Sequence, residues 1–468
     1  MSTSILEKFD SDSRSDASSE ATFSQRLTRL LRNYGVETHG FVCTSDLPRR
    51  FVFTDKKLNS IAPVPKEERT DTRLYDLFLL GFSSNMDIPN LALGAGGPVV
   101  FNLSPRSTAI ILVISNALAA IIPAYLAIFG PKLGTRAMVQ ARFSWGVYAV
   151  AVPSILNVLS TMGFPVLGAI VGGQMLATTS DKLTPATGIV IIALVSLARR
   201  FESVAWIPPV VGLAVMVGVG GKHLGAGPAY PPPTAASIIS RGAPWCTVTP
   251  DYGVFHDANA SSASIFTYTY LGLFLPNILL RVLGAAFAAA APGVPSWNAG
   301  YDNGNDLGGL VSAVLAPCGR FGTCLIVLMA LAISAPSAPM MYSFGISLMN
   351  INSAFCKVPR YIYIIGYWSA SYAGIVVTEH VVFRRCDLER YALADWEDAR
   401  KLPPGLAALL AFVASFACIV PCMAQTYYVG PVANVTGDIG LVVGFFSACV
   451  VYGALRPFKI RCFPGHSS

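Results

Sequence analysis

From Leu74 onward the chain consists of apolar runs long enough to cross a lipid bilayer, and this feature limits the possible folds most strongly. A helix needs about 20 mostly apolar residues to span the hydrocarbon. Because backbone groups in lipid must pair within the protein, continuous runs predict helices; a membrane barrel would show alternating segments of about ten residues. The predicted spans are residues 74–100, 107–129, 147–177, 186–198, 204–220, 236–255, 264–290, 322–348, 362–383, 405–424 and 438–455. The fold class is therefore predicted to be all-α, a polytopic membrane protein.

Composition excludes most soluble functions. Of the 468 residues, 53% are hydrophobic and 13% are charged, whereas soluble domains carry roughly 25% charged residues. The net charge of +7 forms no contiguous basic face, so nucleic acid is not an expected partner. We find no phosphate loop, zinc motif or Ser-His-Asp set in a suitable context, so no enzyme, cofactor or metal is expected. Cys418 and Cys422 lie one helical turn apart without a nearby His or acid, which favours packing over metal binding.

Charges between the runs predict the orientation in the membrane. Residues 1–25 are polar and predicted to be disordered, and no signal peptide is recognised, so the N-terminus is expected in the cytosol. The loop with Lys132, Arg136 and Arg142 then falls on the cytoplasmic side, where basic residues are retained, and the loop around Asp302 falls outside. The predicted parts are a cytosolic region at residues 1–73, a transmembrane transporter domain at 74–455 and a cytosolic tail at 456–468.

One pair of basic clusters conflicts with this orientation. Lys357 and Arg360 precede the run at 362–383, and a second cluster that begins with Arg384 and Arg385 follows it. Both clusters are typical of cytoplasmic loops, yet a single apolar run separates them. Either one spanning helix is missing or this run does not cross the membrane.

Two predicted spans contain helix breakers at matching places. The first contains Asp87, Pro89 and a Gly-rich stretch at 94–98, and the sixth contains Thr249-Pro250-Asp251. Pro removes a backbone donor and Gly loosens a helix, so both segments are expected to unwind. Transporters built from inverted repeats place their solute site at such breaks, and a spacing of five spans fits a five-helix repeat. The alternative is that Pro and Gly are simply common in membrane helices.

Several side chains are candidates for the solute site. Asp87 and Asp251 are acids within spans, where a charge is costly and by default functional; alternatively, each reaches water from a helix end. Glu202 lies beside Arg199 and Arg200, so a loop ion pair competes with a coupling role. Two aromatic residues, Phe164 and Trp245, are candidates for stacking on a flat heterocycle, although single aromatics more often serve packing.

The sequence resembles the fungal purine-cytosine permeases of the nucleobase:cation symporter family from about Gly35 to the C-terminus. The matching blocks are Phe129–Arg136, Val139–Ser144, Ile170–Gln174, Ala205–Pro208, Ala288–Pro292, Pro295–Tyr301, Ile365–Ser369 and Glu379–Arg385.

The resemblance implies a leucine-transporter-like fold of twelve helices, ten of them in two inverted five-helix repeats. It implies proton-driven uptake of cytosine and purines, with the substrate held between helices one, three, six and eight. The implied substrate-binding residues are Asn90, Phe164, Gly168, Trp245, Asp251, Ser337 and Pro339, and the proton-coupling candidates are Asp87 and Glu202.

The chain departs from the family pattern in composition and length. Gly168 and Pro336 stand where relatives usually present amides, and a base edge needs donors and acceptors. Sequence is missing near Ala198 and Arg241, and between Tyr361 and Ile364 the loss amounts to about 20–25 residues, one spanning helix. The last gap coincides with the charge conflict, so one helix of twelve is predicted to be absent.

The function predicted from these residues is secondary active transport of purine bases and cytosine by alternating access, coupled to protons, in the plasma membrane. The predicted partners are a small nucleobase-like solute and the lipid bilayer. Two alternatives stay open: a relative specialised for allantoin, uracil or a vitamin-like heterocycle, and a degenerate or mis-spliced permease without transport.

Overall fold

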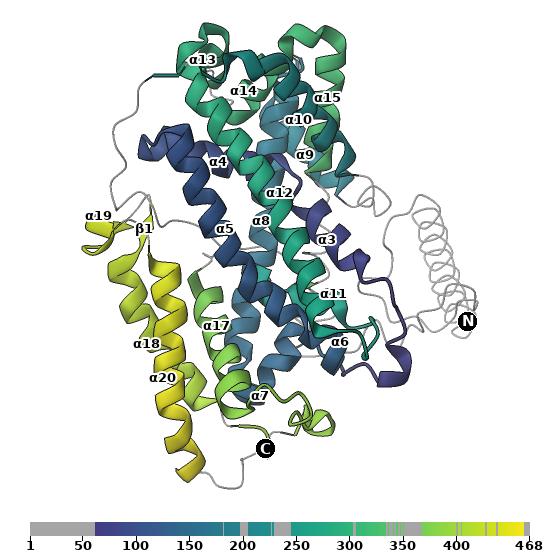
Figure 1. The fold of residues 1–468 in the computed structure, drawn as a ribbon, viewed down its shortest axis with the longest axis vertical. Helices are drawn as coiled ribbons and strands as arrows, with labels where there is room; N and C mark the ends of the chain where they lie inside the picture. Colours follow the sequence, from purple (N-terminus) through teal and green to yellow (C-terminus); the bar gives the residue numbers. More distant parts are fainter. Residues whose placement is uncertain are drawn as a thin grey trace, which may run out of the picture.

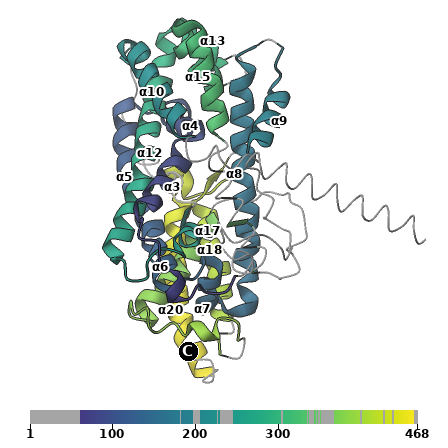
Figure 2. The same ribbon diagram turned by 90° about the vertical axis from the view of Figure 1, so that its right-hand side faces the viewer.

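The computed structural model describes residues 61–462 with internal gaps. The gaps are residues 181, 197–204, 226, 229–244, 303–305, 334–335, 337–339, 341–342, 345–346, 348–349, 351–366, 399–400, 404, 426–427 and 437–438. The described chain is almost entirely helical and forms an elongated bundle (Figures 1 and 2).

The helices of the first half follow the predicted spans with added short elements. They are η1 (Lys66–Glu68), α3 (Tyr75–Asn85), α4 (Ile88–Phe101), α5 (Pro105–Ala127), α6 (Phe129–Leu133), α7 (Ala137–Ala149), α8 (Ala151–Ala177), α9 (Pro185–Val195), α10 (Ile207–Gly220) and η3 (Gly221–His223).

The second half adds two helices that the sequence did not predict, α13 and α14, in the loop after the seventh span. Its elements are η5 (Trp245–Thr247), α11 (Thr249–Gly253), α12 (Ser262–Ala290), η6 (Ala291–Gly293), α13 (Pro295–Asp302), α14 (Asp306–Leu315), η7 (Ala316–Cys318), α15 (Gly319–Ala332), α17 (Tyr367–Thr378), the π-helical turn η9 (Glu379–Phe383), η10 (Leu393–Asp395), α18 (Leu406–Cys422), β1 (Ala424–Gln425), β2 (Tyr428–Val429), α19 (Ala433–Thr436) and α20 (Gly440–Cys462). The two short strands pair antiparallel.

Length and composition support membrane insertion. Among the described residues, five helical stretches are long and apolar enough to cross a bilayer: Pro105–Leu133, Ala151–Ala177, Ser262–Gly293, Leu307–Ala332 and Gly440–Pro457. Large apolar side chains remain exposed on their outer faces, for example Leu118 on α5 and Val450 on α20. In lipid such faces are solvated by hydrocarbon.

The first predicted span is broken, as its sequence indicates. α3 ends at Asn85, and Met86 has φ −85° and ψ 64°, outside the helical region. Asp87 is extended and forms the N-cap of α4, with Pro89 in the first turn. The break is confined to two residues, because the Gly-rich stretch up to Pro98 stays inside α4.

The sixth span is also interrupted in its described part. Val248, with φ −131° and ψ −20°, separates η5 from α11, whose second residue is Pro250. The rest of this predicted span, residues 236–244, lies outside the described residues.

α4 packs against α12 at backbone distance. A Cβ added to Gly94 would lie 1.9 Å from the carbonyl oxygen of Arg281, and one added to Gly284 would lie 2.0 Å from that of Leu91. Small residues at helix contacts in membranes permit this approach. The second half-helix of the broken span, α4, therefore packs closely against the long helix α12.

The basic segment after α5 differs from its prediction as a loop. It forms α6 and α7, and Arg136, Arg142 and Trp145 are buried there. The preceding chain packs onto it, since Arg69 Nη1 donates to the carbonyl of Pro131 at 2.7 Å. Part of the polar region at 1–73 thus belongs to the packed structure.

α7 and α18 meet through two glycines with left-handed backbones. Gly146 has φ 74° and Gly405 has φ 65°. A Cβ on the first would lie 1.9 Å from the carbonyl oxygen of Pro403, and one on the second would lie 1.9 Å from that of Trp145. Glycine meets both the torsional and the steric requirement.

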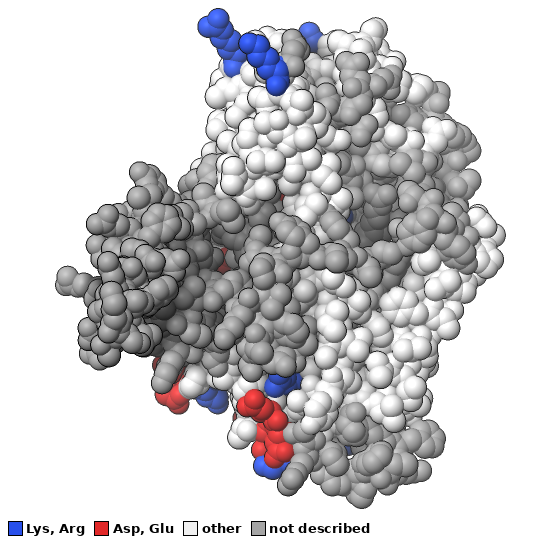
Figure 3. Space-filling view, turned by 180° about the vertical axis from the view of Figure 1, so that it is seen from behind, with Lys and Arg blue, Asp and Glu red and all other residues white. Residues whose placement is uncertain are grey.

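The two ends of the bundle carry the loops that were predicted to lie on opposite sides. At the α7 end, Arg142 stacks over the Trp396 ring at 5.0 Å, and Arg384 lies over Phe143 at 5.4 Å, so two basic segments far apart in sequence meet. α13 and α14 lie at the opposite end (Figure 1). On the face in Figure 3, most of the visible charged side chains lie at the top and toward the bottom of the view, and the white, described surface between them shows few.

Two predicted boundaries can be compared with the structure. α20 runs past Leu455 to Cys462, so the start of the predicted tail is helical. The predicted loss of a helix between Tyr361 and Ile364 lies outside the described residues, as do Lys357 and Arg360.

Candidate functional site

A cavity of about 380 Å³ lies beside the break between α3 and α4. Its wall comes from α3, α4, α5, α8, α12, the chain after α15 and the start of α20. The lining side chains are mostly apolar, with a small polar group formed by Ser84, Asn85, Asp87, Asn90, Asn116, Asn277 and Arg281. An apolar cavity with a few converging polar groups is the usual form of a small-molecule site.

The structure brings four of the predicted residues together here. Asp87 and Asn90 line the cavity from the break, and Phe164 and Gly168 line it from α8. Phe164 is 41% exposed and is a cavity-lining residue. A Cβ on Gly168 would lie 2.9 Å from Cγ2 of Ile333, so a larger residue at this position requires that side chain to move.

Asp251 lies elsewhere. Its Oδ1 accepts the backbone N–H of Ala137 at 2.8 Å, the first residue of α7, and Asp251 is not among the cavity-lining residues. A carboxylate at a helix N-terminus satisfies an otherwise unpaired donor and interacts favourably with the helix dipole. In this structure Asp251 therefore joins α11 to α7.

The other predicted site residues cannot be placed. Glu202, Ser337 and Pro339 lie outside the described residues, and the side chain of Trp245 does as well. Their roles remain predictions.

Asn90 is the centre of the polar group at the break. Its backbone N–H and its Nδ2 donate to Oδ1 of Asp87 at 3.1 and 2.9 Å. Nδ2 also donates to the carbonyl of Asn85 at 3.0 Å, across the break. These bonds fix the Asp87 side chain relative to both half-helices.

Arg281 on α12 completes this group, and the sequence analysis missed it. Nε and Nη2 donate to Oδ1 of Asn90 at 3.3 and 3.1 Å, and Nη1 donates to Oδ1 of Asn116 on α5 at 2.6 Å. Arg281 lies nine residues before the end of α12, about 13 Å along its axis. The sequence did contain a sign of its importance. Arg281 is an ionisable residue inside an apolar run, and such a residue is a functional candidate for the same reason as Asp87.

Two acceptors near the cavity lack protein partners among the described residues. Asp87 uses only Oδ1, and its Oδ2 receives no hydrogen bond. Oδ1 of Asn277 is buried without a partner, while its Nδ2 donates to Asn85 Oδ1 at 3.3 Å. Buried polar groups are normally paired, so the unbonded Oδ2 of Asp87, a cavity-lining residue, is a candidate acceptor for a ligand with N–H or O–H donors.

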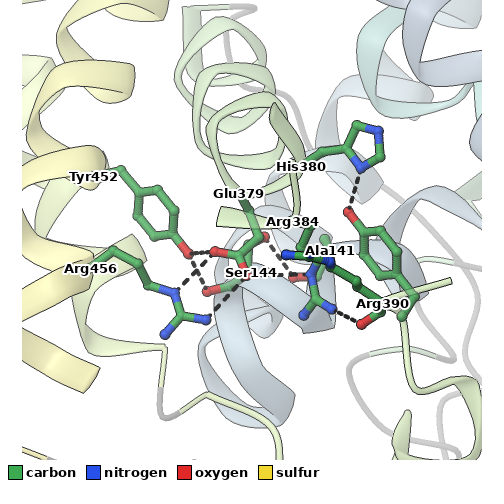
Figure 4. Close-up of polar contacts among 9 residues, drawn as sticks. Ala141, Ser144, Glu379, His380, Arg384, Arg390, Tyr452 and Arg456 are labelled. Atoms are coloured by element: carbon green, nitrogen blue, oxygen red, sulfur yellow. Dashed lines mark hydrogen bonds and ion pairs between the residues drawn. The ribbon is translucent and has the colours of Figure 1, made fainter. Parts of the chain in front are cut away.

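A second polar cluster lies at the α7 end, away from the cavity (Figure 4). Oε2 of Glu379 accepts from Tyr452 Oη at 2.8 Å and Arg456 Nε at 3.0 Å, and Oε1 accepts from Arg456 Nη2 at 3.1 Å. Arg384 Nε lies 3.5 Å from Oε1. This Glu379 cluster ties α17 to α20 and, through the bond of Tyr452 to the Ser144 carbonyl, to α7.

Two consecutive residues of the π-helical turn η9, Glu379 and His380, contact different parts of the structure. Glu379 and His380 are both buried, and His380 Nδ1 lies 3.2 Å from the Tyr391 hydroxyl. In an α-helix, neighbouring residues point about 100° apart; a π-turn widens the helix locally and often marks functional positions. Glu379 contacts Tyr452 and Arg456 of α20, while His380 contacts Tyr391 in the loop that follows η9.

The chain matches the family model described as permease for cytosine/purines, uracil, thiamine and allantoin over residues 63–201 and 190–444. The purine-cytosine permease fcyB of Emericella nidulans is 30% identical over 86% of this chain and 89% of the relative. The purine-cytosine permease FCY2 of Saccharomyces cerevisiae is 28% identical over 92% and 91%. The vitamin B6 transporter TPN1 of Saccharomyces cerevisiae is 25% identical over 78% and 81%. All three are transport proteins and not enzymes.

The fold resembles a solved transporter. Mhp1, a nucleobase-cation-symport-1 transporter, in a closed conformation with bromovinylhydantoin bound, superposes with a TM-score of 0.60 at 16% identity over 87% of this chain and 96% of Mhp1. Its inward-facing conformation gives the same TM-score over 91% and 97%. This likeness confirms the predicted leucine-transporter-like architecture.

Proposed function

Because the chain belongs to the family of permeases for cytosine and purines, uracil, thiamine and allantoin, we propose that it takes up purine bases and cytosine as a secondary active transporter. The observation that carries the proposal is the cavity at the helix break, which is lined by both Phe164 and Asp87.

The chemistry of that wall suits a flat, neutral heterocycle. Phe164 offers an aromatic face for stacking, and aromatic pairs contribute about 0.5–1.5 kcal/mol beyond the area they bury. Asp87 Oδ2 is an unbonded acceptor that suits the ring N–H or exocyclic amine of a base. A solute that donates to this oxygen replaces its lost water contacts, whereas an analogue without donors leaves the oxygen unpaired.

We propose proton symport by alternating access in the plasma membrane, with the N-terminus in the cytosol. Asp87 is the described acid at the site, and Glu202 is the second coupling candidate. An intramembrane carboxylate that contacts both the break and the cavity is suited to link proton binding with solute loading.

A second candidate function is transport of another heterocycle. Gly168 and Pro336 line the cavity where relatives usually carry amides, and the similarity to a vitamin B6 transporter fits a changed preference. Allantoin, uracil and vitamin-like heterocycles are the compounds in question. A third reading is a degenerate or mis-spliced product without transport.

Uptake in a yeast strain without its own base permeases tests these alternatives. We expect labelled cytosine and adenine to accumulate, uptake to fall with a protonophore, and Phe164→Ala to reduce it about tenfold at equal surface abundance. The matched control is Phe321→Ala, because Phe321 is 57% exposed on α15 outside the cavity. Accumulation of pyridoxine or uracil but neither cytosine nor adenine would transfer the assignment to the second candidate.

The absence of all uptake would favour the third reading, and the transcript then distinguishes its forms. Sequencing across Tyr361 shows whether codons for a further helix exist. Restoring such codons should recover uptake if the chain is a mis-spliced permease.

A further inference from the structure

Arg281 has no part in the function described so far, although it places a permanent charge inside a membrane helix. An isolated charge there costs at least about 2.5–3.5 kcal/mol, so its retention calls for partners or a role. We propose that Arg281 is a positioning residue: through Asn90 it holds Asp87 so that Oδ2 remains available to the solute.

The guanidinium is held in a fork between two helices. Two of its nitrogens donate to the single acceptor Oδ1 of Asn90, and a third donates to Oδ1 of Asn116 at 2.6 Å. Asn116 is itself oriented, since its Nδ2 donates to the Leu112 carbonyl at 2.8 Å. The planar, rigid fork of arginine fits this double contact, which a lysine ammonium cannot reproduce.

The bonds of Asn90 show why it transmits orientation instead of contacting the solute. Its Oδ1 receives two bonds from Arg281, and both Nδ2 hydrogens are used, one by Asp87 Oδ1 and one by the Asn85 carbonyl. An amide has two donors and about two acceptor positions, so this side chain is fully occupied. Asn90 was predicted to bind substrate, but the contacts assign it to the support of Asp87.

The backbone of Arg281 reinforces the arrangement. Its carbonyl oxygen lies against Gly94 of α4, where an added Cβ would approach to 1.9 Å. Both the main chain and the side chain of Arg281 therefore set the position of α4 relative to α12. A binding group that is already held in place by hydrogen bonds to its neighbours loses less conformational entropy when it binds a ligand.

Uptake kinetics test the proposal, which rests on the proposed function for its substrate. We expect Arg281→Met to raise KM for the imported base about tenfold or more, with Vmax changed far less, because the site is mispositioned before binding. Arg281→Lys should raise KM by a smaller factor. Arg320→Met is the control, since Arg320 is exposed at the start of α15.

A double-mutant cycle tests the route through Asn90. Asn90→Ala should raise KM as Arg281→Met does, and the double variant should be no worse than Asn90→Ala alone within about twofold. If the two effects multiply, or if Arg281→Met and Arg281→Lys both keep the wild-type KM at normal surface abundance, the proposal is overturned.

A measurement without transport separates this proposal from the proposed function. In the purified full chain without solute, Arg281→Met should speed hydrogen exchange at the backbone amides of 88 and 90–92, with α8 unchanged. If exchange rises but no base is imported by the wild type, the proposed function fails and the positioning role stands. If a base is imported and exchange is unchanged, the positioning role alone fails.

Discussion

The cavity group around Asp87 and the Glu379 cluster each bury a carboxylate beside arginine, but they distribute hydrogen bonds differently. At the cavity, Asp87 uses one oxygen, and Oδ2 has no partner among the described residues. In the Glu379 cluster both oxygens are bonded, and Tyr452 and Arg456 surround them. The Asp87 group therefore leaves one carboxylate oxygen without a hydrogen bond beside a cavity, whereas both carboxylate oxygens of Glu379 accept hydrogen bonds.

A buried acid that binds a solute and one that only stabilises the fold can share several properties. Burial and charge pairing are shared, so neither identifies a solute site by itself. What distinguishes the cavity group is a carboxylate oxygen, Oδ2 of Asp87, that has no partner among the described residues and belongs to a cavity-lining residue. We therefore expect substitutions in the two clusters to affect different measurements.

The largest effect is expected on stability, at Glu379. Glu379→Gln removes the negative charge that faces Arg384 and Arg456, and breaking a buried ion pair costs about 3–5 kcal/mol. Thermal unfolding of the detergent-purified chain should shift down strongly. Tyr452→Phe, which removes one hydrogen bond, should cost only about 1.5–3 kcal/mol. Equal stability of Glu379→Gln and wild type would show that the cluster is not structural.

A smaller effect, on the efficiency of solute uptake, is expected at Asp87. Asp87→Asn keeps an N-cap residue of equal preference, so α4 should stay folded, while the accepting carboxylate is lost. Loss of a charged hydrogen bond predicts a fall in uptake efficiency of about 10- to 100-fold. The same variant should unfold within a few degrees of the wild type. Normal uptake with lost stability would reverse the comparison between the two clusters.

The smallest effect is expected at a surface ion pair outside both clusters. Asp71 accepts from Arg73 Nη2 at 2.7 Å, and this contact lowers the pKa of Asp71 to about 2. Because the folded-state pKa is depressed, the stabilisation is complete above the ordinary value near 4 and is lost as the pH falls through 2. Arg73 is mostly exposed and solvent screens the pair, so the loss of stability should be small.

Unfolding curves of wild type and Asp71→Asn, recorded from pH 7 down to pH 2, check this expectation. They should differ little at pH 7 and converge at low pH. A large difference at pH 7 would place Asp71 among the structural acids.

Much of the fold followed from the sequence because lipid imposes simple rules. Apolar length predicted most of the long helices, and Asp87 with Pro89 predicted the break between α3 and α4. α7 was missed because Arg136 and Arg142 are typical of solvated loops, whereas here their side chains are buried by the loop after α17 and by neighbouring helices.

The site was predictable in part. Phe164 and Asp87 reach the cavity wall, as their residue types indicated. Asp251 looked equivalent to Asp87 in sequence, since each lies within two residues of a proline in a broken span, but it bonds to the start of α7. Only the packing of α11 against the α6–α7 segment makes this distinction, and such long-range contacts leave no local sequence pattern.

The paired glycines at 146 and 405 have a mechanical consequence. With carbonyl oxygens of Trp145 and Pro403 in the space where side chains would stand, α7 and the start of α18 touch main chain to main chain. Close-packed main chain leaves little freedom to slide at these two points, so we expect the two segments to move together. We expect conformational changes of the transporter to occur at other helix contacts. A methyl group at either glycine would push the two segments apart.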